Sequence, residues 1–249
     1  MHYNSAKDQK ESYRDLLRAN TFLILTRAMA DEVMLLDFWP SVFGMRLRIA
    51  LREKGVEFGY QDEDFSNKSA LLLEMNPVHK MIPVLIHKGK PVCESLIALQ
   101  YIDETWKDDK CTLMPSDPYQ SAQARFWADF LDRKVHTLGK KTWQTKGETR
   151  DAARKEFLEC LRLLEAQLGD EPYFGGETFG FLDVAFIPFH AWFTVFDRLG
   201  EVSIETECPK LKEWAERCVQ RESVSKSIPD REKVYEFVYY VLRKRLGIE

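Results

Sequence analysis

Two serines lie where a predicted strand is followed by a predicted helix, which is a position suited to binding anions. Ser41 comes directly after Trp39 and Pro40, and Ser95 comes directly after Glu94. A helix N-terminus offers free backbone amides and a partial positive charge, and a serine adds a hydroxyl. Each serine taken alone is more often a plain N-cap. Together with Glu94, which could take an ammonium group, the two serines could hold both ends of a small zwitterion.

Two further features of the same region each have two interpretations. Taken alone, Lys68 is more often a solvated loop residue than a point charge that meets a ligand carboxylate. Ile82 precedes Pro83, which is either a strand-start proline or part of a cis peptide bond. In the second case the backbone of Ile82 would be exposed to pair with an extended, peptide-like ligand. The residue types alone do not separate the two interpretations of Pro83.

Composition narrows the chemistry that these residues could perform. The 249 residues include 36 Lys and Arg and 40 Asp and Glu, which leaves a net charge of −4. No global positive field therefore favours nucleic acid or an anionic membrane, and we expect neither as a partner. The chain has no Walker loop and no GxGxxG, HExxH or GxSxG motif, and its five histidines have no metal-ligand spacing. We therefore expect no metal and no bound cofactor.

Cysteine usage and hydropathy indicate where the protein works. The five cysteines are odd in number, widely spaced and never in a CxxC pair. This pattern favours a reducing compartment over a disulfide framework. No apolar run approaches the ~20 residues that a membrane span needs. The sequence therefore predicts a soluble protein.

The elements that must position these residues change in periodicity along the chain. Up to residue 108 the order is β-α-β-α-β-β-α, with strands expected at 33–39, 57–62, 84–87 and 91–93, and helices at 43–51, 69–76 and 95–106. From residue 119 the period is 3.6 throughout, with helices expected at 119–141, 149–168, 181–199, 209–220 and 233–246. We therefore predict a disordered extension at 1–30, a small α/β domain at 31–108 and an all-helical domain at 118–249.

Four stretches of the chain read LLDFWPSVFGMRLRIAL, NKSALLLEMNPVHKMIPVLIHKGKPVCESLIALQYIDE, DPYQSAQARFWADF and GFLDVAFIPF. Together they closely resemble plant tau-class glutathione transferases. The resemblance covers residues 31–249 and implies an α+β architecture, with a thioredoxin-like N-terminal domain followed by an all-α C-terminal domain. It also implies a cytoplasmic homodimer that conjugates glutathione, as a co-substrate, to hydrophobic electrophiles in detoxification and stress response. Weak glutathione peroxidase activity is compatible with this expectation.

The resemblance also implies a role for each residue of the glutathione site. By position, Ser41 is the catalytic serine, Lys68 the partner of the glycyl carboxylate, and Ile82 the backbone that pairs with the cysteinyl unit. Glu94 and Ser95 are then the anchor of the γ-glutamyl group. One position departs from the family pattern, because relatives usually have a lysine where Met81 stands. We therefore expect weaker affinity for glutathione.

The chemistry expected of Ser41 follows from the acidity of a thiol. A free thiol has a pKa near ~8.5, so only a few per cent is nucleophilic thiolate at neutral pH. Lowering that pKa by about two units requires ~2.7 kcal/mol. One charge-assisted hydrogen bond supplies ~1.5 to 3 kcal/mol. Ser41 is therefore expected to donate a hydrogen bond to the sulfur, and not to attack the electrophile itself.

The electrophile pocket is expected between the two domains, where concave apolar sites usually form. Its expected walls are Phe38, Val42, Phe43, His136, Trp143, Trp192 and Phe196. For most of these aromatic side chains, ordinary core packing is the more common role. His136 is the stronger candidate, because a polar ring would be awkward inside a helical bundle. A non-catalytic carrier of hydrophobic ligands or glutathione conjugates is the alternative function.

Overall fold

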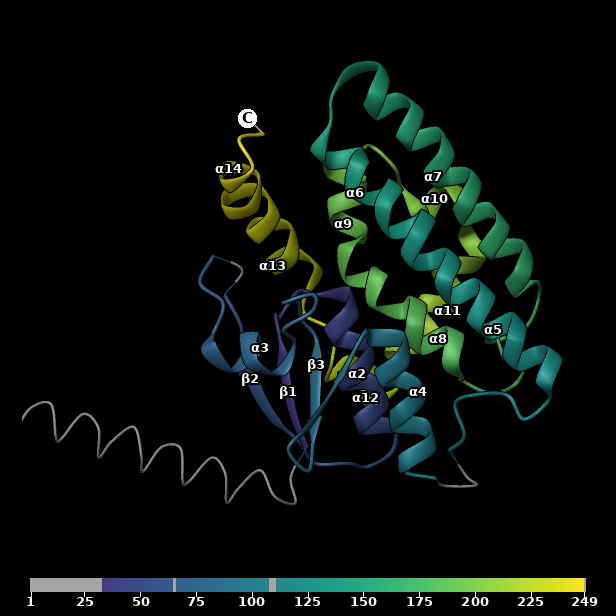
Figure 1. Ribbon diagram of the computed structural model, residues 1–249. Helices are drawn as coiled ribbons and strands as arrows, with labels where there is room; N and C mark the ends of the chain where they lie inside the picture. Colours follow the sequence, from purple (N-terminus) through teal and green to yellow (C-terminus); the bar gives the residue numbers. More distant parts are fainter. Residues whose placement is uncertain (1–32, 65, 108–110, 249) are drawn as a thin grey trace, which may run out of the picture.

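The chain folds into a small four-stranded sheet with three helices, followed by a larger group of helices (Figure 1). The computed structural model describes residues 33–64, 66–107 and 111–248. The disordered extension predicted at 1–30 lies outside the described residues. In the first part the elements are β1 (Val33–Asp37), α2 (Val42–Glu53), β2 (Gly59–Asp62), α3 (Ala70–Met75), β3 (Val84–His87), β4 (Lys90–Cys93) and α4 (Ser95–Thr105).

The sheet has the strand order β2-β1-β3-β4, with β1 parallel to β2 and antiparallel to β3. Because side chains alternate along a strand, each strand contributes to two layers. Leu35 and Leu85 join the large core with α2 and α4. Leu36 and Val84 point to the opposite face, where they form a small cluster with Leu72 of α3. The sheet is thus covered by α2 and α4 on one face and by α3 on the other.

The second part of the described chain is helical. Its elements are α5 (Pro118–Phe130), η1 (Leu131–His136), α6 (Thr137–Gln144), α7 (Gly147–Leu168), α8 (Phe181–Phe186), η2 (Ile187–Trp192), α9 (Phe193–Arg198), α10 (Ile204–Glu207), α11 (Pro209–Val219), α12 (Glu222–Ser225), α13 (Arg231–Glu236), η3 (Phe237–Leu242) and α14 (Arg243–Arg245). In Figure 1, α13 and α14 stand over the sheet, beside the other helices.

Three of the predicted helices differ from the structure in the same way. The helix expected at 119–141 runs from 118 to 144, with the π-helical turn η1 in its middle. The helix expected at 181–199 contains the 3-10 segment η2, and the helix expected at 233–246 contains the π-helical turn η3. A 3.6-residue period does not reveal such local changes of helical pitch. The short helices α10 and α12 were not predicted.

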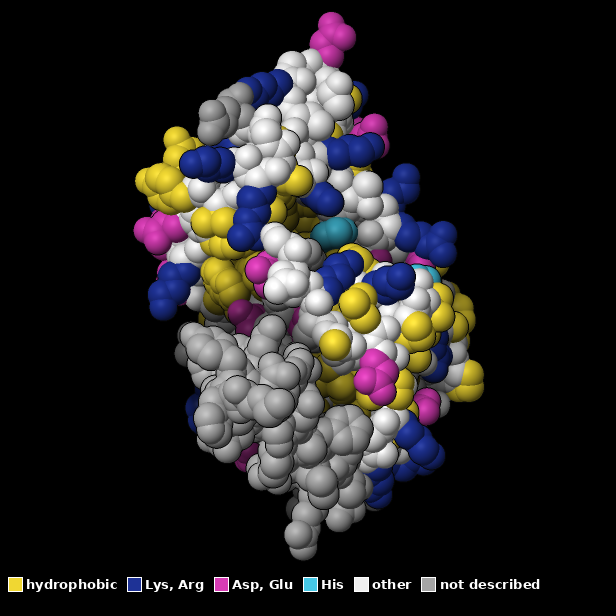
Figure 2. Space-filling model, turned by 60° about the vertical axis from the view of Figure 1, so that its left-hand side comes forward, with side chains coloured by type: hydrophobic (Ala, Val, Ile, Leu, Met, Phe, Trp, Pro, Cys, Tyr) yellow, Lys and Arg dark blue, Asp and Glu magenta, His cyan; other side chains and the backbone are white. Residues whose placement is uncertain are grey.

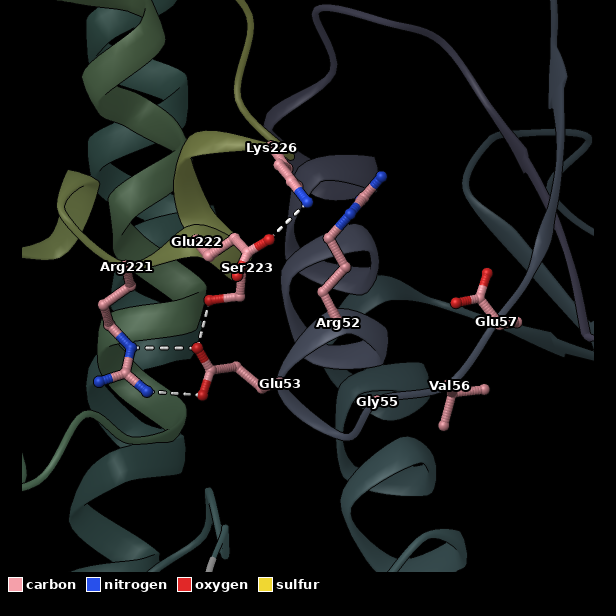
Figure 3. Close-up of a pocket in the computed structure, with 9 residues that line it drawn as sticks. All are labelled: Arg52, Glu53, Gly55, Val56, Glu57, Arg221, Glu222, Ser223 and Lys226. Atoms are coloured by element: carbon pink, nitrogen blue, oxygen red, sulfur yellow. Dashed lines mark hydrogen bonds and ion pairs between the residues drawn. The ribbon is translucent and has the colours of Figure 1, made fainter.

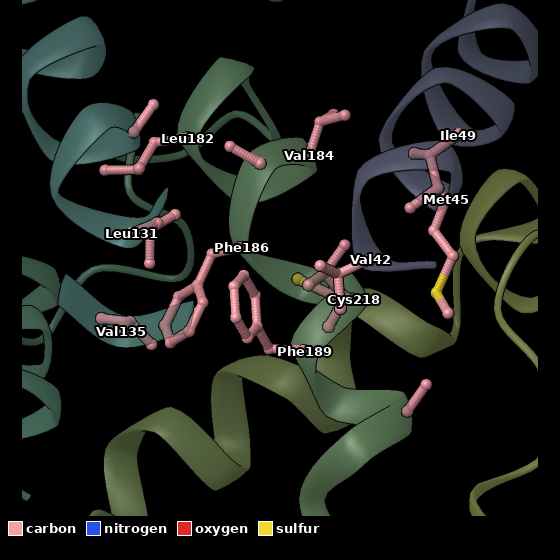
Figure 4. Close-up of a cluster of buried hydrophobic side chains, with 14 of the residues drawn as sticks. Val42, Met45, Ile49, Leu131, Val135, Leu182, Val184, Phe186, Phe189 and Cys218 are labelled. Atoms are coloured by element: carbon pink, nitrogen blue, oxygen red, sulfur yellow. The ribbon is translucent and has the colours of Figure 1, made fainter. Parts of the chain in front are cut away.

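The two parts of the chain share one hydrophobic core. Figure 4 shows side chains of α2, of η1 and of the segment from α8 to η2 close together. Those drawn from these elements include Val42, Met45, Ile49, Leu131, Val135, Val184, Phe186 and Phe189. Helix α2, which follows Ser41, is therefore held by the sheet on one side and by the helical domain on the other.

Two properties of the described residues concern membranes and metals. No helix in 33–64, 66–107 or 111–248 combines the length and hydropathy of a membrane span. Among the same residues, no group of three or more His, Cys, Asp or Glu side chains is arranged to hold a metal ion. All five cysteines are free thiols.

Candidate functional site

Ser41 is the N-cap of α2, as its position in the sequence indicates. Its backbone is extended, with φ −70° and ψ 119°, and its Oγ accepts a long hydrogen bond of 3.4 Å from the backbone N of Gly44. The backbone N of Ser41 donates to the carbonyl of Phe38 at 2.8 Å, which closes the turn after β1. The hydroxyl hydrogen of Ser41 is not used by the Gly44 contact, so it can be donated to a ligand.

The turn before Ser41 is held from the helical domain. The indole Nε1 of Trp192 donates to the carbonyl of Pro40 at 2.9 Å. The ring of Phe237, in η3, packs edge-on against Phe38 and Trp39, with 5.5 Å between ring centroids in each pair. The place of the Ser41 hydroxyl is thus set by both domains.

Lys68 and Ile82 lie together beside Phe38. A hollow is lined by these three residues with Glu63, Asp64, Leu72, Lys80 and Met81. The Nζ of Lys68 donates to the carbonyl of Lys80 at 2.8 Å and lies 4.0 Å from the Sδ of Met81. The peptide bond between Ile82 and Pro83 is cis, which decides between the two interpretations of this proline. The structure therefore brings the candidate residues for the glycyl and cysteinyl units to one hollow.

Glu94 and Ser95 stand at the start of α4. Glu94 has a positive φ of 67°, a conformation that a non-glycine residue rarely adopts. Its side chain is exposed, makes no capping bond, and has its Oε1 3.8 Å from the Nε2 of His79. Ser95 is buried, and its Oγ accepts a hydrogen bond of 3.0 Å from the Nη1 of Arg46. The Ser95 hydroxyl thereby keeps its own hydrogen for a ligand carboxylate.

Arg46 joins this serine to the helical domain. Its side chain is fully buried, and it makes a two-point contact with the carboxylate of Asp132 in η1, at 2.6 and 3.1 Å. Its Nε donates to the carbonyl of Ala185 in α8 at 2.9 Å. A buried guanidinium needs such partners to offset its desolvation. The γ-glutamyl end of the candidate site is thus braced by two helices of the other domain.

Sequence reasoning missed Arg46 and Asp132. One signal was present, because Arg46 follows Phe43 by three residues and precedes Ala50 by four, so a charge lies on the apolar face of the predicted helix. Such a charge requires a buried partner. The partner itself could not be read from the sequence, because Asp132 is 86 residues away in the chain.

Four of the expected pocket residues are half-buried near the junction of the domains. They are Phe38, Phe43, His136 and Trp192. The ring centroids of Phe43 and His136 are 4.8 Å apart in an edge-to-face arrangement. Burial, and then the positive charge of Lys140, lowers the pKa of His136, so this ring is neutral at pH 7. A neutral imidazole is compatible with an apolar ligand.

The other three expected pocket residues are buried in the core. Val42 faces the shared core, and the ring of Phe196 packs on Phe157 with 5.1 Å between centroids. Trp143 stacks on Trp192 with 6.3 Å between centroids and is only 5% exposed. Of the three, Trp143 contacts a half-buried member of the expected pocket, Trp192.

Two domain families match this chain. The family described as "Glutathione S-transferase, N-terminal domain" matches residues 31–104, and "Glutathione S-transferase, C-terminal domain" matches residues 147–217. A probable glutathione S-transferase, parC, of Nicotiana tabacum is 61% identical over 88% of this chain and 99% of its own length. Glutathione S-transferase U25 of Arabidopsis thaliana is 62% identical over 89% of this chain and 99% of its own length.

Solved structures agree with these matches. The rice transferase OsGSTU1 in complex with glutathione is 50% identical, with a TM-score of 0.82, over 87% of this chain and 98% of the rice chain. The tau-class transferase of mango, Mangifera indica, is 42% identical, with a TM-score of 0.79, over 84% of this chain and 98% of the mango chain. The chain belongs to the tau class of glutathione S-transferases. The predicted family, the thioredoxin-like domain with its all-α partner and the transferase function are confirmed.

Another hollow of this transferase lies away from Ser41. It has a volume of about 530 Å³ and opens between the end of α2 and helix α12 (Figure 3). Most of its charged groups are paired with each other. The carboxylate of Glu53 accepts from Arg221 at 2.7 and 3.0 Å and from the hydroxyl of Ser223, and Glu222 pairs with Lys226. The contacts of Glu53 with Arg221 and Ser223 join the two domains of the transferase, and the predicted site residues are not among the lining of this hollow.

Proposed function

We propose that this transferase adds the thiolate of glutathione to apolar electrophiles at the N-terminus of α2. The observation that carries the proposal is Ser41, whose hydroxyl caps α2 as an acceptor and keeps its hydrogen for the sulfur. The free amides and the partial positive charge of the helix end support the same thiolate. Binding the electrophile next to that sulfur supplies the remaining acceleration.

Glutathione is proposed to lie between Ser41 and two anchors. The Lys68 ammonium would meet the glycyl carboxylate, and the backbone of Ile82 would pair with the cysteinyl unit. The Ser95 hydroxyl would donate to the γ-glutamyl carboxylate, while the exposed carboxylate of Glu94 would take the ammonium group. The shared hollow at Lys68 and Ile82 and the position of Ser95 under Arg46 support this orientation.

The electrophile is proposed to contact Phe38, Phe43, His136 and Trp192. Their half-burial near the domain junction and the neutral state of His136 favour an apolar, planar ligand. Val42, Trp143 and Phe196 would support this wall from the core. The alternative of a non-catalytic carrier has less support, because the relatives in tobacco and Arabidopsis are named as transferases.

Replacing Ser41 tests the proposal directly. Ser41→Ala removes the hydrogen bond to the sulfur, so the second-order rate of glutathione conjugation to a chlorodinitrobenzene should fall about 10- to 100-fold, equivalent to ~1.5 to 3 kcal/mol. The matched control is Ser41→Thr, which keeps the hydroxyl and should retain most of the rate. Circular dichroism would show that both variants fold. An Ala variant with the wild-type rate would remove Ser41 from the mechanism.

A homodimer is proposed from exposed apolar side chains near the junction of α4 and α5. Ile97 of α4 is 57% exposed and Phe126 of α5 is 58% exposed. The two helices meet there, since Arg125 donates to Gln100 at 2.9 Å. Large apolar side chains that stay exposed on adjacent helices are typical of a protein interface. A second copy of this chain is the proposed occupant.

Sedimentation measurements test the dimer. Phe126→Glu places a charge in the proposed interface, so the variant should sediment as a monomer where the wild type sediments as a dimer. The control is Leu163→Glu, at another exposed apolar residue, on α7, which should leave the association unchanged. A dimeric Phe126→Glu variant would place the interface elsewhere.

Location and other partners are also inferred. The five free thiols favour the reducing cytoplasm. Nucleic acid is not expected as a partner, because basic side chains on the face in Figure 2 are interspersed with acidic and hydrophobic ones. Binding of a labelled duplex that disappears as salt is raised would contradict this expectation.

A further inference from the structure

Asp37 is a buried carboxyl group that the proposed mechanism does not use. It is the last residue of β1, four residues before Ser41, and it is 0% exposed. Its carboxylate has few partners among the described residues: the guanidinium of Arg48 and the backbone of Phe38. A buried carboxyl group with so few partners carries a high desolvation cost.

This carboxyl group lies directly against the first turn of α2. A β-carbon at position 44 would be only 1.6 Å from the Oδ1 of Asp37. Only glycine therefore fits at position 44 when the Asp37 side chain is in this position. The backbone N of Gly44 is the group that donates to the Ser41 hydroxyl. Asp37 is therefore packed against the same turn of helix that presents Ser41 to the sulfur.

Three charged or titratable side chains face Asp37. Arg48, one turn further along α2 than Gly44, has its Nε 3.3 Å from the Oδ2 of Asp37. Tyr60 and Asp62, on the neighbouring strand β2, also interact with it electrostatically. Burial raises the pKa of Asp37 to about 7, while Arg48 and a backbone hydrogen bond from Phe38 act against burial and Asp62 acts with it. The carboxyl group is thus only partly ionised near neutral pH.

We propose that Asp37 is a positioning residue whose protonation is coupled to formation of the glutathione thiolate at Ser41. A negative sulfur at the N-terminus of α2 repels a negative carboxylate packed under the same turn. Each charge therefore disfavours the other. When bound glutathione loses its thiol proton to solvent, Asp37 takes up a proton from solvent and the repulsion is removed. The inference rests on the proposed thiolate at Ser41.

The net number of protons released when glutathione binds measures this coupling. Thiolate formation releases up to one proton, and a half-ionised Asp37 can take up to about half a proton in return near pH 7. Calorimetry of glutathione binding in two buffers of different ionisation enthalpy measures the net number. We expect Asp37→Asn, which cannot take up a proton, to release up to about half a proton more per glutathione than the wild type.

A thiol-free ligand supplies the matched control. S-methylglutathione binds through the same groups but forms no thiolate, so the wild type and Asp37→Asn should show equal proton numbers with it. A residue with a purely structural role would not distinguish the two ligands. Equal numbers with glutathione itself, while ultraviolet difference spectra show thiolate in both proteins, would overturn the inference. Lack of thiolate in the wild type would instead contradict the proposed role of Ser41.

A second variant covers the case in which Asp37→Asn fails to fold. Arg48→Gln removes the positive charge that favours ionised Asp37, so the carboxyl group should already be protonated near pH 7. This variant should then release more protons than the wild type on binding glutathione, and no more on binding S-methylglutathione. The wild-type proton number in Arg48→Gln would also overturn the inference.

Discussion

At the residue scale, the hydroxyl of Ser41 has a structural use and a proposed chemical use. It accepts a hydrogen bond from Gly44 and so caps α2, and it keeps a hydrogen for the sulfur. The sequence left the plain N-cap and the anion site as alternatives. The geometry shows that one hydroxyl can serve both, because a serine oxygen accepts and donates at the same time.

Met81 is the residue at which this transferase departs from the pattern expected of its class. It is 49% exposed, and its sulfur is 4.0 Å from the ammonium group of Lys68. A thioether carries no charge, so position 81 supplies no cation to help Lys68 hold the glycyl carboxylate. We therefore expect this transferase to bind glutathione more weakly than relatives that have lysine at this position.

Met81→Lys should therefore tighten glutathione binding. One added, exposed charge contact is worth up to about 1 kcal/mol, so the Kd measured by calorimetry should fall about two- to five-fold. Raising the salt concentration should reduce the difference, since exposed charges are screened. Met81→Leu is the control, and it should keep the wild-type Kd. An unchanged Kd in Met81→Lys would show that position 81 does not contribute to carboxylate binding.

At the element scale, the π-helical turn η1 places two residues at the site. Asp132 meets the buried Arg46, and His136 meets Phe43. Widened helical turns of this kind often occur at functional sites. The sequence predicted a helix over these residues and placed His136 near the pocket. It did not predict the π-helical turn, because one wider turn hardly changes the hydrophobic period of a long helix.

Much of the fold could be predicted because its elements have strong local signals. Gly55 ends α2 with a φ of 63°, as expected for a glycine after a helix, and the hairpin from β3 to β4 turns at Lys88 and Gly89. Helices α10 and α12 were missed because four residues are too few to show a period. The contacts of Asp37 and Arg46 were missed because they join residues that are distant in sequence.

Arg46→Met should weaken both stability and glutathione binding. It leaves the Asp132 carboxylate without its buried partner and takes away the hydrogen bond to Ser95, so we expect a loss of about 3 kcal/mol in the free energy of unfolding. The KM for glutathione should rise more than kcat falls. Arg46→Lys should not restore the wild type, because an ammonium group cannot make the two-point contact. A stable Met variant with normal KM would contradict this.

At the scale of the whole molecule, the two domains act as one body around a common core. Val42 and Met45 of α2 belong to the same buried cluster as Phe186 and Phe189 of the helical domain. Trp192, Arg46 and Glu53 add polar contacts across the junction. The domain bounds 31–108 and 118–249 remain a prediction, and we do not expect either part to be stable alone.

The stability of the transferase should decrease in acid because of His190. Burial, and then the positive charge of Arg231, lowers the pKa of His190 to about 4 from an ordinary value of 6.5. The folded protein binds this proton less readily than the unfolded chain. The stabilisation from keeping His190 neutral is therefore complete above pH 6.5 and is lost as the pH falls towards 4.

His190→Phe should remove this part of the acid sensitivity. A shift of this size corresponds to about 3 kcal/mol, so the wild type should lose up to that amount between neutral pH and about pH 4 relative to the variant. Urea unfolding at a series of pH values measures the difference. Parallel curves for the two proteins across this range would show that His190 is not the cause.

The hydrogen bond between Trp192 and the carbonyl of Pro40 ties an indole ring to the turn that carries Ser41. The same ring stacks on Trp143. A third indole, that of Trp39, belongs to the residue directly before Pro40. Indole emission is sensitive to nearby charge and to contact with quenching rings. The natural fluorescence of this enzyme should therefore follow occupancy of its pocket in real time, without any attached dye.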